Sequence, residues 1–323
     1  MTQSVLLTGG LGYVGGRVAR YLAGNPDYEV FVTSRDPQSQ EFPAWLGKDH
    51  CIGMDILNDA EVKNACRDMD TVIHLAALNE IESQKDPGKA LLVNGLGTQK
   101  LVRSAEECGV SRFIYFSTAH IYRSPLEGSF TESTIPRPVH PYAISHRTAE
   151  DFVLAATTEG KFQGVVLRLS NSIGAPISTR VDRWSLIGND LCRQAITTRE
   201  MQLKTLGTQE RDFIPLLDVG RAVSHMIQLP DNTLGDGIFN LGGENTQSIL
   251  SLAQLIQERC SITFGFTPPI TRPAASPPRE KIRLVYSIEK LKMTGFRLSG
   301  SLAKEIDDTL IFCKDHLLDH RST

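Results

Sequence analysis

The stretch Thr8-Gly9-Gly10-Leu11-Gly12-Tyr13-Val14-Gly15 decides the fold of this chain. A short apolar run, residues 5–8, leads into it, and an amphipathic run, residues 13–23, starts inside it. The glycines therefore lie at a strand-to-helix turn. Glycine permits a tight turn there, and the last glycine lets the helix pack close to the strand. The pattern predicts the first β–α unit of a doubly wound parallel sheet.

The same turn is suited to a phosphate group. The first N–H groups of a helix have no intrahelical partner, and the helix dipole is positive at that end. The sequence therefore predicts a dinucleotide site whose contacts include Gly9, Gly12, Tyr13, Val14 and Gly15. The alternative is a glycine-rich turn without a ligand.

The remainder of the chain extends this unit. Apolar runs predict further strands at residues 29–33, 50–53, 71–75, 113–117 and 164–169, and amphipathic runs predict helices at 60–67, 89–108 and 142–159. Residues 1–170 are expected to form a Rossmann-type doubly wound α/β domain, whose core continues around 213–245. Residues 171–323, richer in Gly and Pro, are expected to form mainly a smaller α/β substrate-binding lobe, with helices at 248–259 and 301–316.

Composition narrows the class of protein. The 323 residues include 34 Lys+Arg and 37 Asp+Glu, a net charge of -3, and no long basic run, which disfavours a nucleic-acid partner. The six cysteines are scattered, without metal-ligand spacing, so reduced and mostly buried thiols and no structural metal are expected. No signal peptide or membrane span is recognisable, and a cytoplasmic location is expected.

The end of the second predicted strand reads Thr33-Ser34-Arg35. A dinucleotide fold that selects NAD usually carries an acid at this place, whereas an arginine suits the 2′-phosphate of NADP. NADP is therefore favoured, and NAD stays possible because Asp36 comes next. Asp55, followed by Ile56, is expected to accept a hydrogen bond from adenine or to cap the following helix.

Several later motifs carry a family resemblance. They are His74-Leu75-Ala76-Ala77, Asn94-Gly95-Leu96-Gly97-Thr98, Phe116-Ser117-Thr118, Pro141-Tyr142, Leu167-Arg168-Leu169-Ser170-Asn171, Arg211-Asp212-Phe213-Ile214 and Phe239-Asn240-Leu241-Gly242. Together with the glycine turn they resemble an extended short-chain dehydrogenase/reductase of the nucleotide-sugar epimerase/dehydratase family. The resemblance implies cofactor contacts at Leu75, Ala76, Ala77 and Asn94, and a homodimer formed through helices 89–108 and 142–159.

The resemblance also implies catalytic residues. Thr118 matches the hydroxyl residue that binds the reacting sugar hydroxyl, and Tyr142 matches the acid/base of a YxxxK motif. The lysine of that motif is replaced by His146, which shares a helix face with Tyr142, whereas Arg147 does not. With an ordinary pKa of about 6.5, His146 would be roughly one quarter protonated at pH 7. One interpretation is that Tyr142 and His146 retain a weaker, pH-sensitive version of the acid/base pair. The other is a protein specialised away from the usual hydride chemistry.

The reaction follows less directly. Dehydratases of this family carry acids after the threonine, where this chain has Ala119 and His120, so a 4,6-dehydratase is disfavoured. His120 is then a lone acid/base or a polar loop residue. An epimerase that oxidises a sugar carbon transiently is placed ahead of an NADPH-dependent keto-sugar reductase, and a cofactor-binding homologue with weak or altered activity is a third alternative.

The resemblance reaches the substrate end at three residues. Asn171 matches a nucleotide-sugar contact, Arg211 matches a diphosphate contact, and Arg279 is a less closely matched second arginine. The alternative interpretation of each arginine is that it forms a salt bridge at the surface and does not bind the diphosphate. We interpret His74 as a polar residue whose hydrogen bonds are satisfied, and Trp45 and Trp184 as packing residues.

Overall fold

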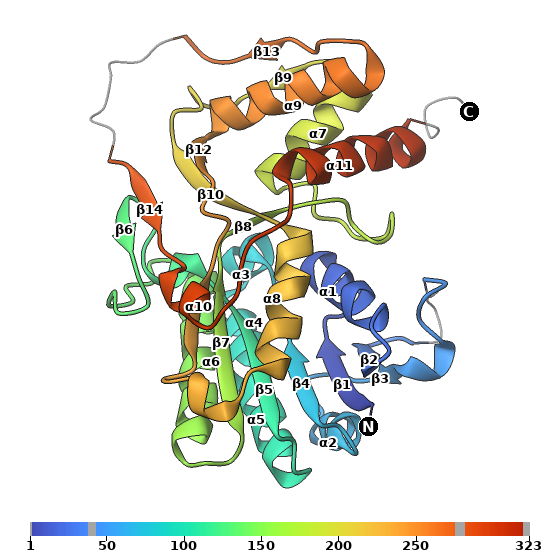
Figure 1. Ribbon diagram of the computed structural model, residues 1–323, viewed down its shortest axis with the longest axis vertical. Helices are drawn as coiled ribbons and strands as arrows, with labels where there is room; N and C mark the ends of the chain where they lie inside the picture. Colours follow the sequence, from blue (N-terminus) through green and yellow to red (C-terminus); the bar gives the residue numbers. More distant parts are fainter. Residues whose placement is uncertain (1, 38–42, 275–281, 319–323) are drawn as a thin grey trace.

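Seven parallel strands form the central sheet of the computed structural model, which describes residues 2–37, 43–274 and 282–318 (Figure 1). Their order is β11-β7-β5-β4-β1-β2-β3. The bounds are β1 Gln3–Thr8, β2 Tyr28–Ser34, β3 Cys51–Gly53, β4 Thr71–His74, β5 Arg112–Thr118, β7 Gln163–Leu169 and β11 Ile238–Leu241. All six predicted strands are present, and the doubly wound α/β fold is confirmed. Strand order reverses between β1 and β4, and this places the glycine turn at the switch point where such sheets bind ligands.

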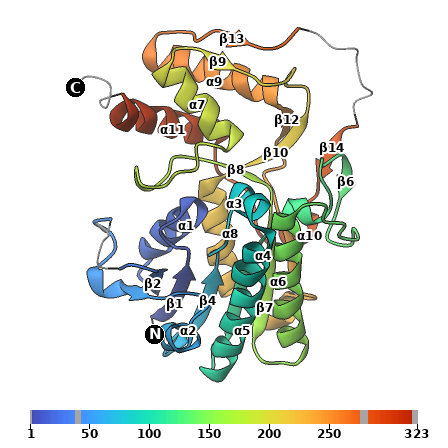
Figure 2. The ribbon, with the colours of Figure 1, turned by 180° about the vertical axis from the view of Figure 1, so that it is seen from behind.

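Helices cover both faces of the sheet (Figures 1 and 2). One face carries α1 (Tyr13–Ala23) and α8 (Leu216–Gln228), and the other carries α2 (Asp59–Cys66), α5 (Gly97–Glu107) and α6 (Pro141–Thr158). Helix α8 was not predicted. It packs closely on α1 because Gly220 has no side chain, and a Cβ atom there would lie 2.8 Å from Tyr21.

The helix predicted at residues 89–108 is in fact three segments. It consists of α4 (Pro87–Ala90), a π-helical segment (Leu91–Leu96) and α5. Asn94 lies in the wider turn and is buried. Its amide accepts a hydrogen bond from the Leu78 N–H at 2.7 Å and donates one to Ser145 Oγ at 3.0 Å. The interruption therefore places Asn94 between the loop after β4 and helix α6.

The second lobe packs three helices over a small sheet (Figure 1). Helices α7 (Ile187–Thr197), α9 (Ile249–Phe264) and α11 (Leu302–Leu317) surround an apolar core of their own. The helices predicted at 248–259 and 301–316 correspond to α9 and α11, whereas α7 was not foreseen. The small sheet has the order β12-β10-β8 and comprises β8 Asn171–Ile173, β10 Glu210–Pro215 and β12 Thr246–Ser248.

Shorter elements complete the described chain. They are α3 Glu80–Lys85, α10 Glu289–Met293, β6 Gly128–Phe130, β9 Met201–Gln202, β13 Ile270–Thr271, β14 Leu284–Tyr286 and the 3₁₀ turns Lys48–His50, Ala119–Ile121 and Asp231–Thr233. An ion pair of 2.7 Å between Arg17 on α1 and Glu305 on α11 ties the second lobe to the sheet domain. Within the described residues, no helix combines the length and the apolar character needed to span a bilayer.

Candidate active site

The glycine turn opens onto a cavity of about 340 Å³ between the two lobes. Gly9 has a φ of +70°, and a Cβ atom there would lie 2.8 Å from the backbone nitrogen of Ala76. A Cβ atom on Gly15 would lie 2.2 Å from the carbonyl oxygen of Gly9. Gly12 caps α1 without a side-chain hydrogen bond, so the start of the helix is open to a ligand. These observations fit a dinucleotide pyrophosphate.

The loop after β4 forms the next part of the wall. Leu75, Ala76 and Ala77 line the cavity, as do Tyr13 and Val14 opposite them. His74 lies beneath, fully buried, with its ring nitrogens 2.6 Å from Thr8 Oγ1 and 2.9 Å from Thr98 Oγ1. Burial lowers the pKa of His74 to about 3, which agrees with its interpretation as a satisfied polar residue. Asn94 is not among the residues that line the cavity.

The segment after β2 is the expected adenosine end. Strand β2 ends at Ser34, and the exposed Arg35 and Asp36 follow. Asp55 is exposed and accepts a hydrogen bond from the Leu57 N–H at 2.9 Å, whereas Ile56 is buried. The cap of α2 is Asn58, whose side chain accepts from the helix N–H groups. The alternative that Asp55 caps this helix is therefore wrong.

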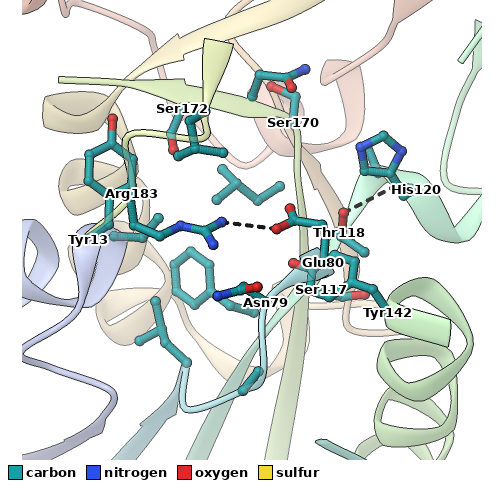
Figure 3. A pocket seen from close by; sticks show the side chains of 18 of the residues that line it. Tyr13, Asn79, Glu80, Ser117, Thr118, His120, Tyr142, Ser170, Ser172 and Arg183 are labelled. Carbon is teal, nitrogen blue, oxygen red and sulfur yellow. Dashed lines mark hydrogen bonds and ion pairs between the residues drawn. The ribbon is translucent and has the colours of Figure 1, made fainter. Parts of the chain in front are cut away.

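Thr118 and Tyr142 come together at the inner end of the cavity (Figure 3). Thr118 is the last residue of β5, and Tyr142 lies in the first turn of α6. Burial raises the pKa of Tyr142 well above the usual 10, and the charge of Glu80 raises it further. The charge of Arg183 and a hydrogen bond with Thr118 act in the opposite direction. The phenol is therefore fully protonated at neutral pH.

His146 lies one helical turn after Tyr142, and their ring centroids are 4.4 Å apart. Its Nδ1 atom is 2.6 Å from the hydroxyl of Tyr115, and only 4% of the residue is exposed. Burial lowers the pKa of His146 to about 4, although Glu80 and the Phe116 backbone favour the charged form. The expectation of one-quarter protonation at pH 7 is therefore wrong, because it ignored burial. Arg147 lies off this face and pairs with Glu150 and Asp151.

The structure adds an ion pair that the sequence did not reveal. Glu80, at the start of α3, lies 3.1 Å from Arg183, in the segment between β8 and α7, and both line the cavity (Figure 3). Burial acts to raise the pKa of Glu80, but Arg183 and hydrogen bonds outweigh it and hold the pKa below its usual range. These residues are 103 positions apart. No motif or spacing in the sequence connects them.

The predicted substrate residues are placed unevenly. Asn171 lines the cavity and donates a hydrogen bond to the Asp212 carbonyl at 3.1 Å. Arg211 is half-buried outside the cavity wall, and its guanidinium donates to the Glu210 carbonyl at 3.0 Å. Arg279 lies outside the described residues. Trp45 and Trp184 each pack against an apolar core, as expected.

Three buried polar atoms of residues at this cavity lack a hydrogen-bond partner among the described residues. Ser117 Oγ, His120 Nδ1 and His146 Nε2 have no hydrogen-bond partner in good geometry among the described residues. All three residues line the cavity. Burial also lowers the pKa of His120 to about 4, so its ring is neutral at pH 7. Unsatisfied buried polar atoms are costly, and their concentration here is typical of a ligand site.

Comparisons with known proteins show the family of this chain. The model of the NAD dependent epimerase/dehydratase family matches residues 5–242. The chain is similar to a UDP-glucose 4-epimerase of Haemophilus influenzae, at 29% identity over 82% of this chain and 85% of that protein. It is also similar to a dTDP-D-glucose 4,6-dehydratase of Mus musculus, at 30% identity over 79% of this chain and 74% of that protein.

Solved structures share the fold. The UDP-glucose 4-epimerase of Thermus thermophilus in complex with NAD superposes with a TM-score of 0.80 and 23% identity, covering 97% of this chain and all (100%) of that chain. The RMD protein of Pseudomonas aeruginosa complexed with NADPH gives a TM-score of 0.78 at 22% identity, covering 98% of each chain. From its motifs, its fold and the family match, the chain belongs to the NAD dependent epimerase/dehydratase family of extended short-chain dehydrogenases/reductases.

Proposed function

We propose that this protein is an epimerase of nucleotide sugars, which oxidises a sugar carbon transiently and returns the hydride. The observation that carries the proposal is the meeting of Thr118 and Tyr142 in the cavity that begins at the glycine turn. The nicotinamide cofactor supplies hydride acceptance and return. Its pyrophosphate would be held at Gly9, Gly12 and Gly15, and its nicotinamide end near Leu75, Ala76 and Ala77.

In this proposal Tyr142 takes the proton of the reacting sugar hydroxyl, and Thr118 orients that hydroxyl. General acid–base help of this kind contributes about 10²–10⁴ in rate. His146 is neutral and buried, and its open Nε2 atom is placed to hydrogen-bond a cofactor hydroxyl. Because His146 carries no charge to stabilise the phenolate, the proposed turnover is slow at neutral pH.

The substrate would be held by Asn171 within the cavity, with Arg211 and Arg279 as the proposed diphosphate contacts. Arg211 is not among the residues that line the cavity, but its charge acts on His120, which is. Its partly buried guanidinium has a pKa lowered by burial, and an anion would compensate for that burial.

A label experiment tests the proposal. UDP-glucose with deuterium at C4 is incubated with the protein, and the anomeric proton is followed by NMR. Epimerisation gives a new isomer that keeps the deuterium, without net change in absorbance at 340 nm. Thr118→Ala and Tyr142→Phe should each lower the rate by about 10²-fold or more. Loss of deuterium to solvent, or no isomer with any nucleotide sugar tested, would refute the proposal.

A keto-sugar reductase is the second candidate, and Arg35, the residue that follows β2, is the observation that favours it. We propose NADP as the preferred cofactor because a guanidinium there suits a 2′-phosphate. Mass spectrometry of the cofactor released from purified protein tests both points. Oxidised cofactor that stays bound through purification supports the epimerase, whereas readily exchanged NADPH supports the reductase. NADP in either form, with weaker binding in Arg35→Glu, supports the proposed cofactor preference, and NAD would refute that preference.

We also propose a homodimer formed through the π-helical segment and α6. Large apolar side chains are exposed there, namely Leu91, Leu92, Leu96, Ile144 and Phe152. Leu92 is 50% exposed, and Leu92→Lys should produce monomers in light scattering after gel filtration. Ile262→Lys, on α9 and 61% exposed, is the control and should leave the dimer intact. A monomeric wild-type protein would refute this assembly.

A further inference from the structure

The ion pair between Glu80 and Arg183 lies at the catalytic end of the cavity and has no role in the proton transfer proposed above. Arg183 Nη2 donates to Glu80 Oε2 at 3.1 Å. The Glu80 side chain is 42% exposed, and that of Arg183 is 21% exposed. Figure 3 shows the carboxylate beside Thr118 and Tyr142, with Arg183 approaching from the opposite side. The accessible part of this carboxylate therefore faces the space where a substrate would meet the catalytic pair.

The charge of Glu80 acts on several groups at this end of the cavity, although at His120 the opposing charge of Arg211 has the larger effect on the pKa. Burial sets the net pKa shifts of the surrounding groups, and within that the charge of Glu80 acts to raise the pKa of His120, His140, His146 and Tyr142. Three of these are neutral imidazoles near a single carboxylate. The charge of Arg183 acts on Tyr142 only, among these four groups. A ligand at the catalytic end consequently meets the Glu80 carboxylate, which Arg183 neutralises in part.

We infer that Glu80 determines substrate specificity by accepting hydrogen bonds from hydroxyl groups of a neutral sugar and disfavouring a sugar that carries a carboxylate. The inference rests on the proposed nucleotide-sugar substrate. Hydrogen bonds from hydroxyl groups to a carboxylate are short and strong, whereas two carboxylates in a half-buried site repel each other. Arg183 acts as a positioning residue that holds Glu80 in place and partly neutralises it.

The opposite assignment is that Arg183 leaves Glu80 and binds a sugar carboxylate itself. The two assignments differ in the wild type: an acidic sugar binds more weakly than a neutral one if Glu80 determines specificity, and more tightly if Arg183 binds the sugar carboxylate. The variants test whether the charges of the pair act on the sugar at all. Loss of the Glu80 charge relieves repulsion and favours an acidic sugar. Loss of the Arg183 charge leaves Glu80 unneutralised and disfavours an acidic sugar further. A pair that serves only to fasten the lobes together would weaken both kinds of sugar alike in either variant.

Calorimetric titration with UDP, UDP-glucose and UDP-glucuronic acid tests the inference, because these sugars differ in whether C6 is a hydroxyl or a carboxylate. In the wild type, UDP-glucuronic acid should bind about tenfold or more weakly than UDP-glucose, since two carboxylates about 5 Å apart at an effective dielectric constant of about 20 repel each other by more than one factor of ten in affinity. Glu80→Gln should reduce that ratio to about threefold or less, and Arg183→Gln should increase it about threefold or more.

Glu106→Gln is the matched control. Glu106 forms an ion pair of 2.6 Å with Lys161, both side chains are 37% exposed, and neither lines the cavity. The ratio of the dissociation constants of UDP-glucuronic acid and UDP-glucose should be the same in Glu106→Gln as in the wild type. A wild-type protein that binds UDP-glucuronic acid as tightly as UDP-glucose or more tightly would overturn the inference alone and favour the assignment of the carboxylate to Arg183. A ratio unchanged in both variants, or changed in the same direction in both, would also overturn the inference alone. A wild-type protein that binds none of the three nucleotides would overturn the proposed function and this inference with it.

Discussion

Replacing His146 with lysine directly tests how proton transfer at Tyr142 is controlled. The two ring centroids are 4.4 Å apart, and position 146 is almost fully buried. A lysine there would bring a permanent cation to a phenol whose pKa is raised by burial and by Glu80. The structure thus predicts a gain of phenolate where the wild type has a neutral ring.

The magnitude follows from Coulomb's law. Unit charges about 5 Å apart at an effective dielectric constant of about 20 attract each other by about 3 kcal/mol, which corresponds to about two pKa units. The phenolate fraction at pH 7 would rise by about a hundredfold, and the rate by about tenfold because a less basic phenolate is a weaker base. The variant should also be less stable, since it loses the 2.6 Å hydrogen bond between His146 and Tyr115, worth about 1 kcal/mol, and buries an ammonium group.

The assay is turnover of the best nucleotide sugar between pH 5.5 and 10. The rising limb of the profile should move to lower pH by about two units in His146→Lys, and it should be absent in the double variant with Tyr142→Phe. His146→Gln controls for loss of the imidazole and should leave the limb in place. An unchanged profile in a folded His146→Lys protein would refute the idea that a missing cation limits Tyr142.

Three further predictions concern the fold and the cofactor site. Gly15→Ala would place a Cβ atom 2.2 Å from the Gly9 carbonyl oxygen, and it should weaken cofactor binding by about tenfold or more in a fluorescence titration. Gly24→Ala is the control: its Cβ atom would lie 3.4 Å from the nearest atom, so this variant should bind the cofactor normally. Arg168→Met removes a fully buried partner of Glu150, with N···O distances of 2.8 and 3.1 Å, and should lower the free energy of unfolding in urea by about 3–5 kcal/mol. Lys63→Gln, at an exposed pair, should barely move the urea midpoint, and equal effects of the two would contradict the burial argument. Burial lowers the pKa values of His74, His120 and His146 to about 3, 4 and 4, below the ordinary 6.5, so the unfolded chain binds protons first as the pH falls. Stability should therefore be lost between about pH 6.5 and 4, and His146→Gln should reduce the slope there by about 1.4 kcal/mol per pH unit, a change that would be absent if His146 titrated normally.

Much of the fold could be predicted from local sequence patterns. The apolar run of β1, the glycines and helix α1 are consecutive, so their geometry follows from short-range sterics that a sequence displays. The same holds for the other buried strands, whose near-continuous apolar runs are typical of parallel sheets. Helices α7 and α8 were missed because the Gly and Pro content after residue 169 was interpreted as irregular structure. Each of these helices is in fact amphipathic, contains one glycine and no proline, and packs on a distant element of the chain.

At the catalytic end of the cavity, too, some features could be predicted from the sequence and others could not. Thr118 and Tyr142 were found from family motifs, and the structure brings both to one cavity. The charge state of His146 was not predictable, because the pKa of an imidazole depends on burial by segments far away in the chain. Asn94 was assigned to the cofactor, but the π-helical segment turns its amide towards Leu78 and Ser145.

The sequence by itself determined the sheet, the glycine turn at its switch point and the family to which the chain belongs, since each depends on residues close together in order or on recognisable motifs. Only the tertiary structure decided that His146 is neutral and that Glu80 meets Arg183 beside the catalytic pair. Both outcomes depend on which distant surfaces exclude water and which opposite charges approach each other, and these are properties of the packed chain.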